Sequence, residues 1–242
     1  MQSPSRHRPF GSLLILAAAV ALPAAAEPEL RRDTTGFYPI WEGTGHVEKG
    51  GDVSLGTTGA QVGIGDVAHA GVQPLRFIVR SPNGYVKFAL PHWGGWTIST
   101  QVAAYRLLDG ASRGLFSPMY SSRLDNPDFR ATVVPVSLSA SVEPFRWLEV
   151  HQTLTALGVA APGHLRTTLT PGYSIVAEVN PRGRHGISFH ATEVGLWAHD
   201  MTIAGGSYRY RNTWMELRLG YFYRFTKSGV QGTPLAAFGV LL

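Results

Sequence analysis

Cysteine is absent from the 242 residues of this chain. The chain therefore has no disulfide framework, no thiol nucleophile, no thiolate metal site and no cysteine for an N-terminal lipid anchor. Charged residues are also scarce, at 15% of the chain, whereas about a quarter is usual in soluble domains. The formal net charge is +5, but the basic residues form no run, so nothing indicates a nucleic-acid partner.

Long apolar stretches are nearly absent as well. The longest, residues 13–22, follows a basic start at residues 6–8 and precedes three alanines at residues 24–26. This three-part layout predicts a secretory signal peptide over residues 1–26 that is removed on export; an uncleaved anchor helix is the alternative. No other stretch reaches the roughly eighteen apolar residues of a membrane-spanning helix, so a membrane form of the mature chain would have to cross without helices.

The chain has instead an alternation of apolar and polar residues, most regular over residues 213–225. A period of two predicts a β-strand with two unlike faces. One face carries only apolar and aromatic side chains: Met215, Leu217, Leu219, Tyr221, Tyr223 and Phe225. Half of the other face is charged: Trp214, Glu216, Arg218, Gly220, Phe222 and Arg224. Such a stretch is long for a soluble strand but ample to cross a bilayer at a steep tilt.

The same alternation recurs along the mature chain and predicts about ten strands, joined mostly by hairpins. They cover residues 45–57, 60–73, 83–91, 96–107, 131–142, 147–159, 165–179, 184–199, 213–225 and 233–242. Short turns are predicted at 93–95, 143–145 and 180–183, and longer connections at 108–129, 160–164 and 200–206. One end with short turns and one with long loops is typical of outer-membrane barrels. A count of ten places the short turns at the wrong end, which a missed strand near residues 34–66 would correct.

Alternation alone leaves open which face of the strands meets solvent. In a soluble lipocalin-like carrier the apolar face would point inward, whereas in an outer-membrane barrel it would point toward lipid. The export signal, the strand length and the aromatic residues near strand ends favour the membrane form. The polar faces are rich in Ser, Thr and Gly and carry few charges, which is unlike a solvated surface.

Taken together, the export signal, the alternating strands of about ten residues and the aromatic strand ends resemble those of a small bacterial outer-membrane β-barrel. The resemblance covers residues 45–242, after an irregular lead-in at 27–44. It implies an all-β, closed antiparallel up-and-down transmembrane barrel of about ten strands (8–12) in the bacterial outer membrane. It also implies outer-membrane lipid and the barrel assembly machinery as partners, although the chain ends in Leu242 rather than in the aromatic residue usual for the family.

Charged and histidine side chains on the polar faces are predicted to line the lumen. The set comprises Lys87, Glu149, His151, Arg166, Glu178, His190, Glu216, Arg218 and Arg224. Because a barrel of this size has a narrow interior, opposite charges are expected to pair there, for example Arg218 with Glu149 or Glu178. The set then serves either as a paired plug that stabilises the barrel or as the selectivity lining of a narrow pore.

Enzymatic and metal chemistry are weakly indicated. Ser188 and His190 share a face, as in a lipid hydrolase, but strand geometry separates them by about 7 Å, beyond hydrogen-bond reach unless a neighbouring strand, for instance at His151, supplies the partner. The nine histidines are scattered, so no metal site and no cofactor are predicted. The expected function is a structural or narrow-pore role rather than catalysis. A lipid hydrolase and a soluble periplasmic carrier are the alternatives.

Overall fold

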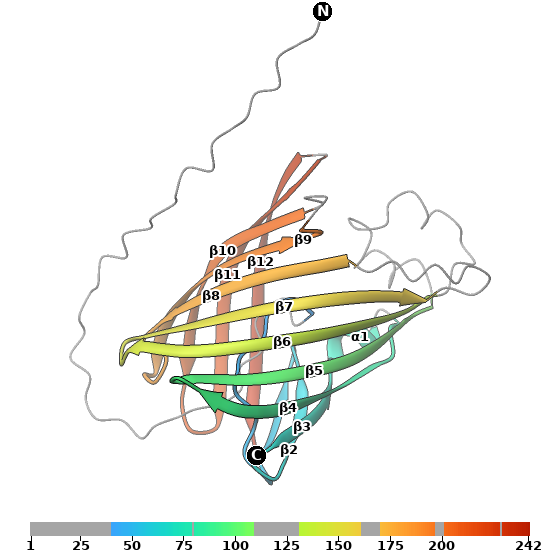
Figure 1. Cartoon of the computed structure of the whole chain (residues 1–242). Helices are drawn as coiled ribbons and strands as arrows, with labels where there is room; N and C mark the ends of the chain where they lie inside the picture. Colours follow the sequence, from blue (N-terminus) through green and yellow to red (C-terminus); the bar gives the residue numbers. More distant parts are fainter. Residues whose placement is uncertain (1–39, 79, 109–130, 161–169, 197–200, 228) are drawn as a thin grey trace, which may run out of the picture.

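A computed structural model of the chain describes residues 40–78, 80–108, 131–160, 170–196, 201–227 and 229–242. Its twelve β-strands form one closed barrel in which sequence neighbours pair antiparallel and β12 pairs with β1 (Figure 1). The first six are β1 (Val53–Gly56), β2 (Ala60–Ile64), β3 (Ala68–Val72), β4 (Asn83–Trp93), β5 (Trp96–Leu107) and β6 (Ala131–Phe145). The others are β7 (Leu148–Ala160), β8 (Thr170–Val179), β9 (His185–Val194), β10 (Met201–Arg211), β11 (Met215–Thr226) and β12 (Gly229–Leu241).

The barrel wall is uneven in height. Strands β1, β2 and β3 have four or five residues each, whereas β4 to β12 have ten to fifteen. A short helix, α1 (Pro74–Ile78), follows β3 and lies beside the end of β5 (Figure 1). In the described part of the chain, no helix is long and apolar enough to cross a membrane.

Polar side chains point into the barrel and apolar side chains point outward. On β6 the inward residues Ser137, Ser139 and Ser141 are buried, while Val136 and Leu138 are 44% and 48% exposed. Since alternate residues of a strand lie on opposite faces, the alternation of buried and exposed residues runs along β6 and β7, and the inward residues become apolar only toward Val133 and Leu157. An apolar exterior around a polar interior is the arrangement of an outer-membrane-type barrel.

The strand number differs from the predicted ten for two reasons. The stretch 60–73 contains two strands, because Gly65 adopts a φ of 55° in a tight turn between β2 and β3. The stretch 200–206, predicted as a connection, belongs largely to β10. Two consecutive glycines at its centre, Gly205 and Gly206, interrupt the apolar alternation by which a strand is recognised.

The corrected count also resolves the direction of the turns. Tight turns after β2, β4, β6, β8 and β10 lie at the end where β1 begins and β12 finishes, here called the short-turn end. The four longest connections, after β3, β5, β7 and β9, lie at the opposite, loop end. The extra strand falls at residues 60–73, overlapping the region 34–66 in which a missed strand was expected.

The first strand starts later than predicted. Residues 45–57 were expected to form it, but β1 begins at Val53. Residues 40–48, which include 40–44 of the predicted lead-in, lie inside the barrel and contact its inner wall. Residues 40–48 are called the lumen segment below.

Candidate functional site: a filled lumen

The lumen segment is held by hydrogen bonds from its backbone to serine, threonine and histidine side chains of the wall. The donor to acceptor distances are Ser174 Oγ to Trp41 O 2.7 Å, Gly43 N to Thr153 Oγ1 3.1 Å, Ser99 Oγ to Thr44 O 2.8 Å, Gly45 N to Ser141 Oγ 2.6 Å and Glu48 N to His69 Nδ1 3.1 Å. These side chains replace the strand or water partners that a buried backbone needs. The inward Ser and Thr residues of the alternation therefore serve as a polar bed for one extended segment.

The direction of the lumen segment follows from its contacts with β7. Thr155 Oγ1 donates to Ile40 O at 3.3 Å, Thr153 bonds Gly43, and Glu149 contacts His46 at 2.5 Å. Since β7 starts at the short-turn end, the segment descends from the loop-end half of the lumen toward the start of β1. It thus occupies the barrel along much of its axis.

Glycine is required where the lumen segment touches the wall most closely. A Cβ on Gly45 would lie 1.9 Å from the carbonyl oxygen of Thr97, and one on Gly43 would lie 2.6 Å from Ser139 Oγ. Real Cβ atoms never approach a backbone oxygen so closely, so only glycine at position 45 lets the segment lie against β5.

The loop-end half of the lumen is an apolar layer. Trp41 and Ile40 pack into a cluster whose other members are Tyr85, Ala103, Tyr105, Leu107, Ala131, Val133, Leu157, Val159, Val194, Met201, Ile203 and Phe222. Val133, Leu157 and Val194 are 0% exposed. These buried side chains form a closely packed layer across this half of the lumen.

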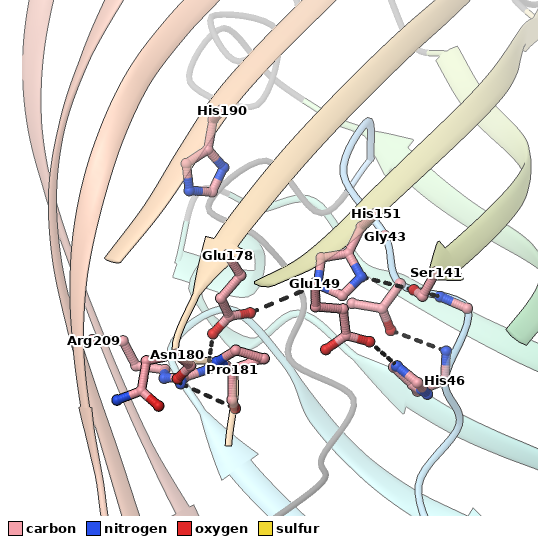
Figure 2. Close-up of polar contacts among 12 residues, drawn as sticks. Gly43, His46, Ser141, Glu149, His151, Glu178, Asn180, Pro181, His190 and Arg209 are labelled. Atoms are coloured by element: carbon pink, nitrogen blue, oxygen red, sulfur yellow. Dashed lines mark hydrogen bonds and ion pairs between the residues drawn. The ribbon is translucent and has the colours of Figure 1, made fainter. Parts of the chain in front are cut away.

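The short-turn half of the lumen is a polar layer built around Glu178. Glu178 receives a hydrogen bond from Arg209 and lies 3.6 Å from His151 Nε2, while His151 Nδ1 lies 2.7 Å from Ser141 Oγ (Figure 2). Glu149, which points to His46 in the same view, forms a second pair at 2.5 Å. Both carboxylates thus have cationic or imidazole partners, as buried charges require.

A third buried arrangement joins the lumen segment to β9 and β10. His190 Nδ1 lies 3.2 Å from Glu42 Oε1, and His190 Nε2 lies 3.2 Å from Ser207 Oγ. The order serine, histidine, carboxylate is that of a hydrolytic triad. All three side chains are buried, and the adjacent cavity has a volume of only about 10 Å³, which is room for one water molecule.

The remaining members of the predicted charge set lie as follows. Lys87 is buried with its Nζ 3.4 Å from Thr44 Oγ1. Arg218 bonds Glu216 on its own strand at 2.6 Å, rather than the predicted Glu149 or Glu178. Arg224 bonds Gln231 at the loop end and lies apart from the polar layer. Arg166 lies outside the described residues.

Several residues that complete the lumen were not predicted. They are Glu42, His46, Glu48, His69, Arg209 and Arg211. Arg209 and Arg211 could have been predicted, because Ser207, Arg209 and Arg211 alternate with Tyr208 and Tyr210 in the sequence. In the lumen segment a similar alternation of Glu, Thr, His and Glu at 42, 44, 46 and 48 was hidden by its position before the first strand. No group of three metal-ligating side chains occurs among the residues described.

Exposed aromatic side chains lie near both ends of the barrel. At the short-turn end Trp93, Trp147 and Trp214 are 77%, 45% and 55% exposed. At the loop end the outward residues of β11 include Tyr221, Tyr223 and Phe225, which are 42–49% exposed. Trp214 and Phe225 are eleven residues apart, which at a strand tilt of about 40° corresponds to roughly 28 Å along the barrel axis. Of the other residues predicted to face lipid, Leu219 is 50% exposed, while Met215 and Leu217 are half-buried on the same outer face.

No protein-family model and no curated protein matches this sequence. Among solved structures the chain is similar to one described as outer-membrane expressed OmpT of Vibrio cholerae. The two share 10% sequence identity with a TM-score of 0.39, over 72% of this chain and 59% of that chain. The match thus spans less than two thirds of that protein, and a likeness this weak establishes no shared function.

Proposed function

We propose that this protein is an outer-membrane β-barrel with a structural role, whose lumen is closed by its own residues 40–48. The observation that carries the proposal is the bonding of this segment to inward side chains of β5 to β8. The segment takes up lumen space that would otherwise hold water, and the inward side chains around it, such as Ser139 and Thr153, are buried.

The two layers of the lumen support closure independently. Water in the loop-end layer would have to wet Val133, Leu157 and Val194, which are wholly buried, and apolar walls favour the dry state. Opening the short-turn layer would separate Glu178 from Arg209 and leave a charge without its partner in a confined interior. Conduction would therefore require both layers to rearrange.

The outer surface supports membrane placement. Large apolar residues exposed on it include Leu55, Phe88, Leu138, Leu154, Ile187, Leu219 and Phe238. A soluble protein rarely exposes a contiguous apolar belt of this extent, whereas lipid matches it and leaves the polar residues inside. In this proposal outer-membrane lipid surrounds the barrel, and the barrel assembly machinery inserts it.

A second candidate function, lipid hydrolysis, is favoured by one observation, the contact of Ser207 with His190 and of His190 with Glu42. Against it, the serine is buried and the adjoining cavity holds no more than a water molecule. We therefore interpret the arrangement as an anchor that fixes Glu42, and with it the lumen segment, to β9 and β10.

Cell fractionation and planar-bilayer recording test the proposal. The chain should be recovered with the outer membrane and should migrate faster on a gel unboiled than boiled; recovery in the soluble periplasm would reject membrane placement.

Refolded wild-type protein should give no conductance steps in planar bilayers. A variant with Ile40→Ser, Trp41→Ser and Glu42→Gln, which removes the apolar and ionic anchors, should give them while keeping heat-modifiable migration. Steps from the wild type would reject closure, and a silent variant would show that other residues close the lumen.

A further inference from the structure

The outer wall of the barrel carries a groove that is separate from the lumen. It has a volume of about 730 Å³ and crosses the outer faces of β1 to β6, within the size range of small-molecule sites. Its depth comes from small residues: Gly84 pairs with Ala104, and Ala70 faces Val86, which in turn pairs with Val102. The lining is almost wholly apolar, so its ligand must be hydrocarbon-like.

A basic residue lies at the loop-end rim of this groove. Arg106 follows Ala104, a lining residue of the groove, by two positions on β5. Both side chains point outward, because the alternate residues Tyr105 and Leu107 are buried. Its backbone N–H donates to Pro82 O at 2.9 Å, but its guanidinium forms no hydrogen bond or ion pair with the described residues. Thr132, its cross-strand neighbour on β6, adds a hydroxyl beside it.

A second arginine of this region is turned away from the groove. Arg76 of α1 lies over the ring of Tyr105 at 4.5 Å and bonds Gln73. Leu75, Phe77 and Ile78 of the same helix are exposed on the outside. The helix thus extends the apolar surface above the short strands, while Arg106 provides a cation at the rim.

An outward arginine is costly within hydrocarbon but not at the interface, where it reaches lipid headgroups. Guanidinium groups bind phosphate oxygens in paired, charge-assisted hydrogen bonds. We propose that the groove binds an outer-leaflet lipid, with an acyl chain along Gly84, Ala104 and Val102 and a negatively charged phosphate headgroup on Arg106 and Thr132. The inference rests on the proposed membrane placement.

Native mass spectrometry of the refolded barrel in detergent tests the site. The probes are phosphatidylglycerol and phosphatidylcholine with the same acyl chains. The wild type should retain one phosphatidylglycerol in preference to phosphatidylcholine. Arg106→Gln should reduce that retention by about fivefold, the size expected for loss of one exposed ionic contact. Ala104→Trp should abolish retention of both lipids, because it fills the groove.

Two matched variants serve as controls. Arg184→Gln removes an exposed arginine at the short-turn end, and Ala236→Trp enlarges an exposed alanine of β12 outside the groove; both should retain lipid as the wild type does. Equal retention of the two lipids, or wild-type retention by Arg106→Gln, overturns the headgroup site. A dimer that Ala104→Trp dissociates and Arg106→Gln does not would make the groove a contact between copies and overturn the lipid site. Fractionation tests the membrane placement separately.

Discussion

Arg209 on β10 reaches across β9 to bond Glu178 on β8. The path is open because residue 186 of β9 is glycine: a Cβ there would lie 2.8 Å from an Arg209 guanidinium nitrogen. The same guanidinium donates to Asn180 O at 3.0 Å and Pro181 O at 3.2 Å. One side chain therefore ties three strands and a turn together at the short-turn end.

Replacement of Arg209 by Met should strongly destabilise the barrel. It leaves Glu178 buried beside His151 without its guanidinium partner, a change that costs about 3–5 kcal/mol. Urea unfolding in lipid vesicles measures the free energy, and adding Glu178→Gln should restore part of it. The matched control is Arg182→Met, which removes a half-exposed pair with Glu143 and should cost less than about 1 kcal/mol. Equal effects of the two arginine variants would contradict the account.

Gly45→Ala should displace the lumen segment. The added methyl group would overlap the carbonyl of Thr97, and overpacking of this kind costs about 1–3 kcal/mol. Gly158→Ala is the control, because a Cβ there would lie 3.5 Å from its nearest neighbour, an ordinary contact. Limited proteolysis should cleave within residues 40–48 in the first variant and not in the second. Protection in both would mean that the segment tolerates a side chain at position 45.

Trp41→Ala should open a cavity in the loop-end layer. Truncation of a buried aromatic residue costs about 3–5 kcal/mol, and Trp41 is 5% exposed. Trp214→Ala, at an exposed position just before β11, should cost far less in the same unfolding measurement. A smaller loss for Trp41 than for Trp214 would place Trp41 outside the core of the lumen.

Leu219→Arg tests the outward direction of β11. Leu219 lies midway between the aromatic residues Trp214 and Phe225 and is 50% exposed, so arginine there should cost about 2–4 kcal/mol in a bilayer. Val230→Arg, near the loop end of β12, should cost at most about 1 kcal/mol. Refolding yields and unfolding free energies in vesicles report both, and a neutral Leu219→Arg variant would show that this face does not meet hydrocarbon.

The variant Ser207→Ala tests whether Ser207 anchors His190 or acts as a catalytic nucleophile. If Ser207 is an anchor, loss of its hydroxyl removes one hydrogen bond to His190 and should lower the free energy of unfolding by about 1 kcal/mol. Release of fatty acid from vesicle phospholipid should not change. A fall in such release to the level of empty vesicles would establish hydrolysis and reject the anchoring role.

The alternating pattern was enough to predict the strands from β4 to β9 and which residues of each face inward. Ser137, Ser139 and Ser141 illustrate why: each strand keeps its period because both faces meet uniform surroundings. The pattern failed at Gly65 and at Gly205, where glycine supplies neither a polar nor an apolar signal. Counting strands therefore required the pairing partners as well as the period.

The lumen was predicted only in part, because pairing inside a barrel depends on stagger between strands. Glu178 proved to pair with Arg209, which lies on the strand that the pattern missed, β10. Glu149 proved to pair with His46, which lies on the lumen segment and not on a strand of the wall. Nothing in the alternation of Ser99 or Thr153 reveals that a second piece of the same chain lies against them. The one indication in the sequence was that serine and threonine outnumber charged residues on the inward faces.

Disulfide cross-linking in outer membranes tests the central claim, that residues 40–48 fill the lumen, most directly. The chain has no cysteine, so Gly43→Cys with Ser139→Cys gives one defined pair, because a Cβ on Gly43 would lie 3.6 Å from the Cβ of Ser139, within the range of disulfides. The cross-strand pair Val136→Cys with Ala156→Cys, on the outer face of β6 and β7, provides the positive control. Both pairs should oxidise and shift in mobility on a non-reducing gel. Oxidation of the control without the 43–139 pair would contradict the filled lumen.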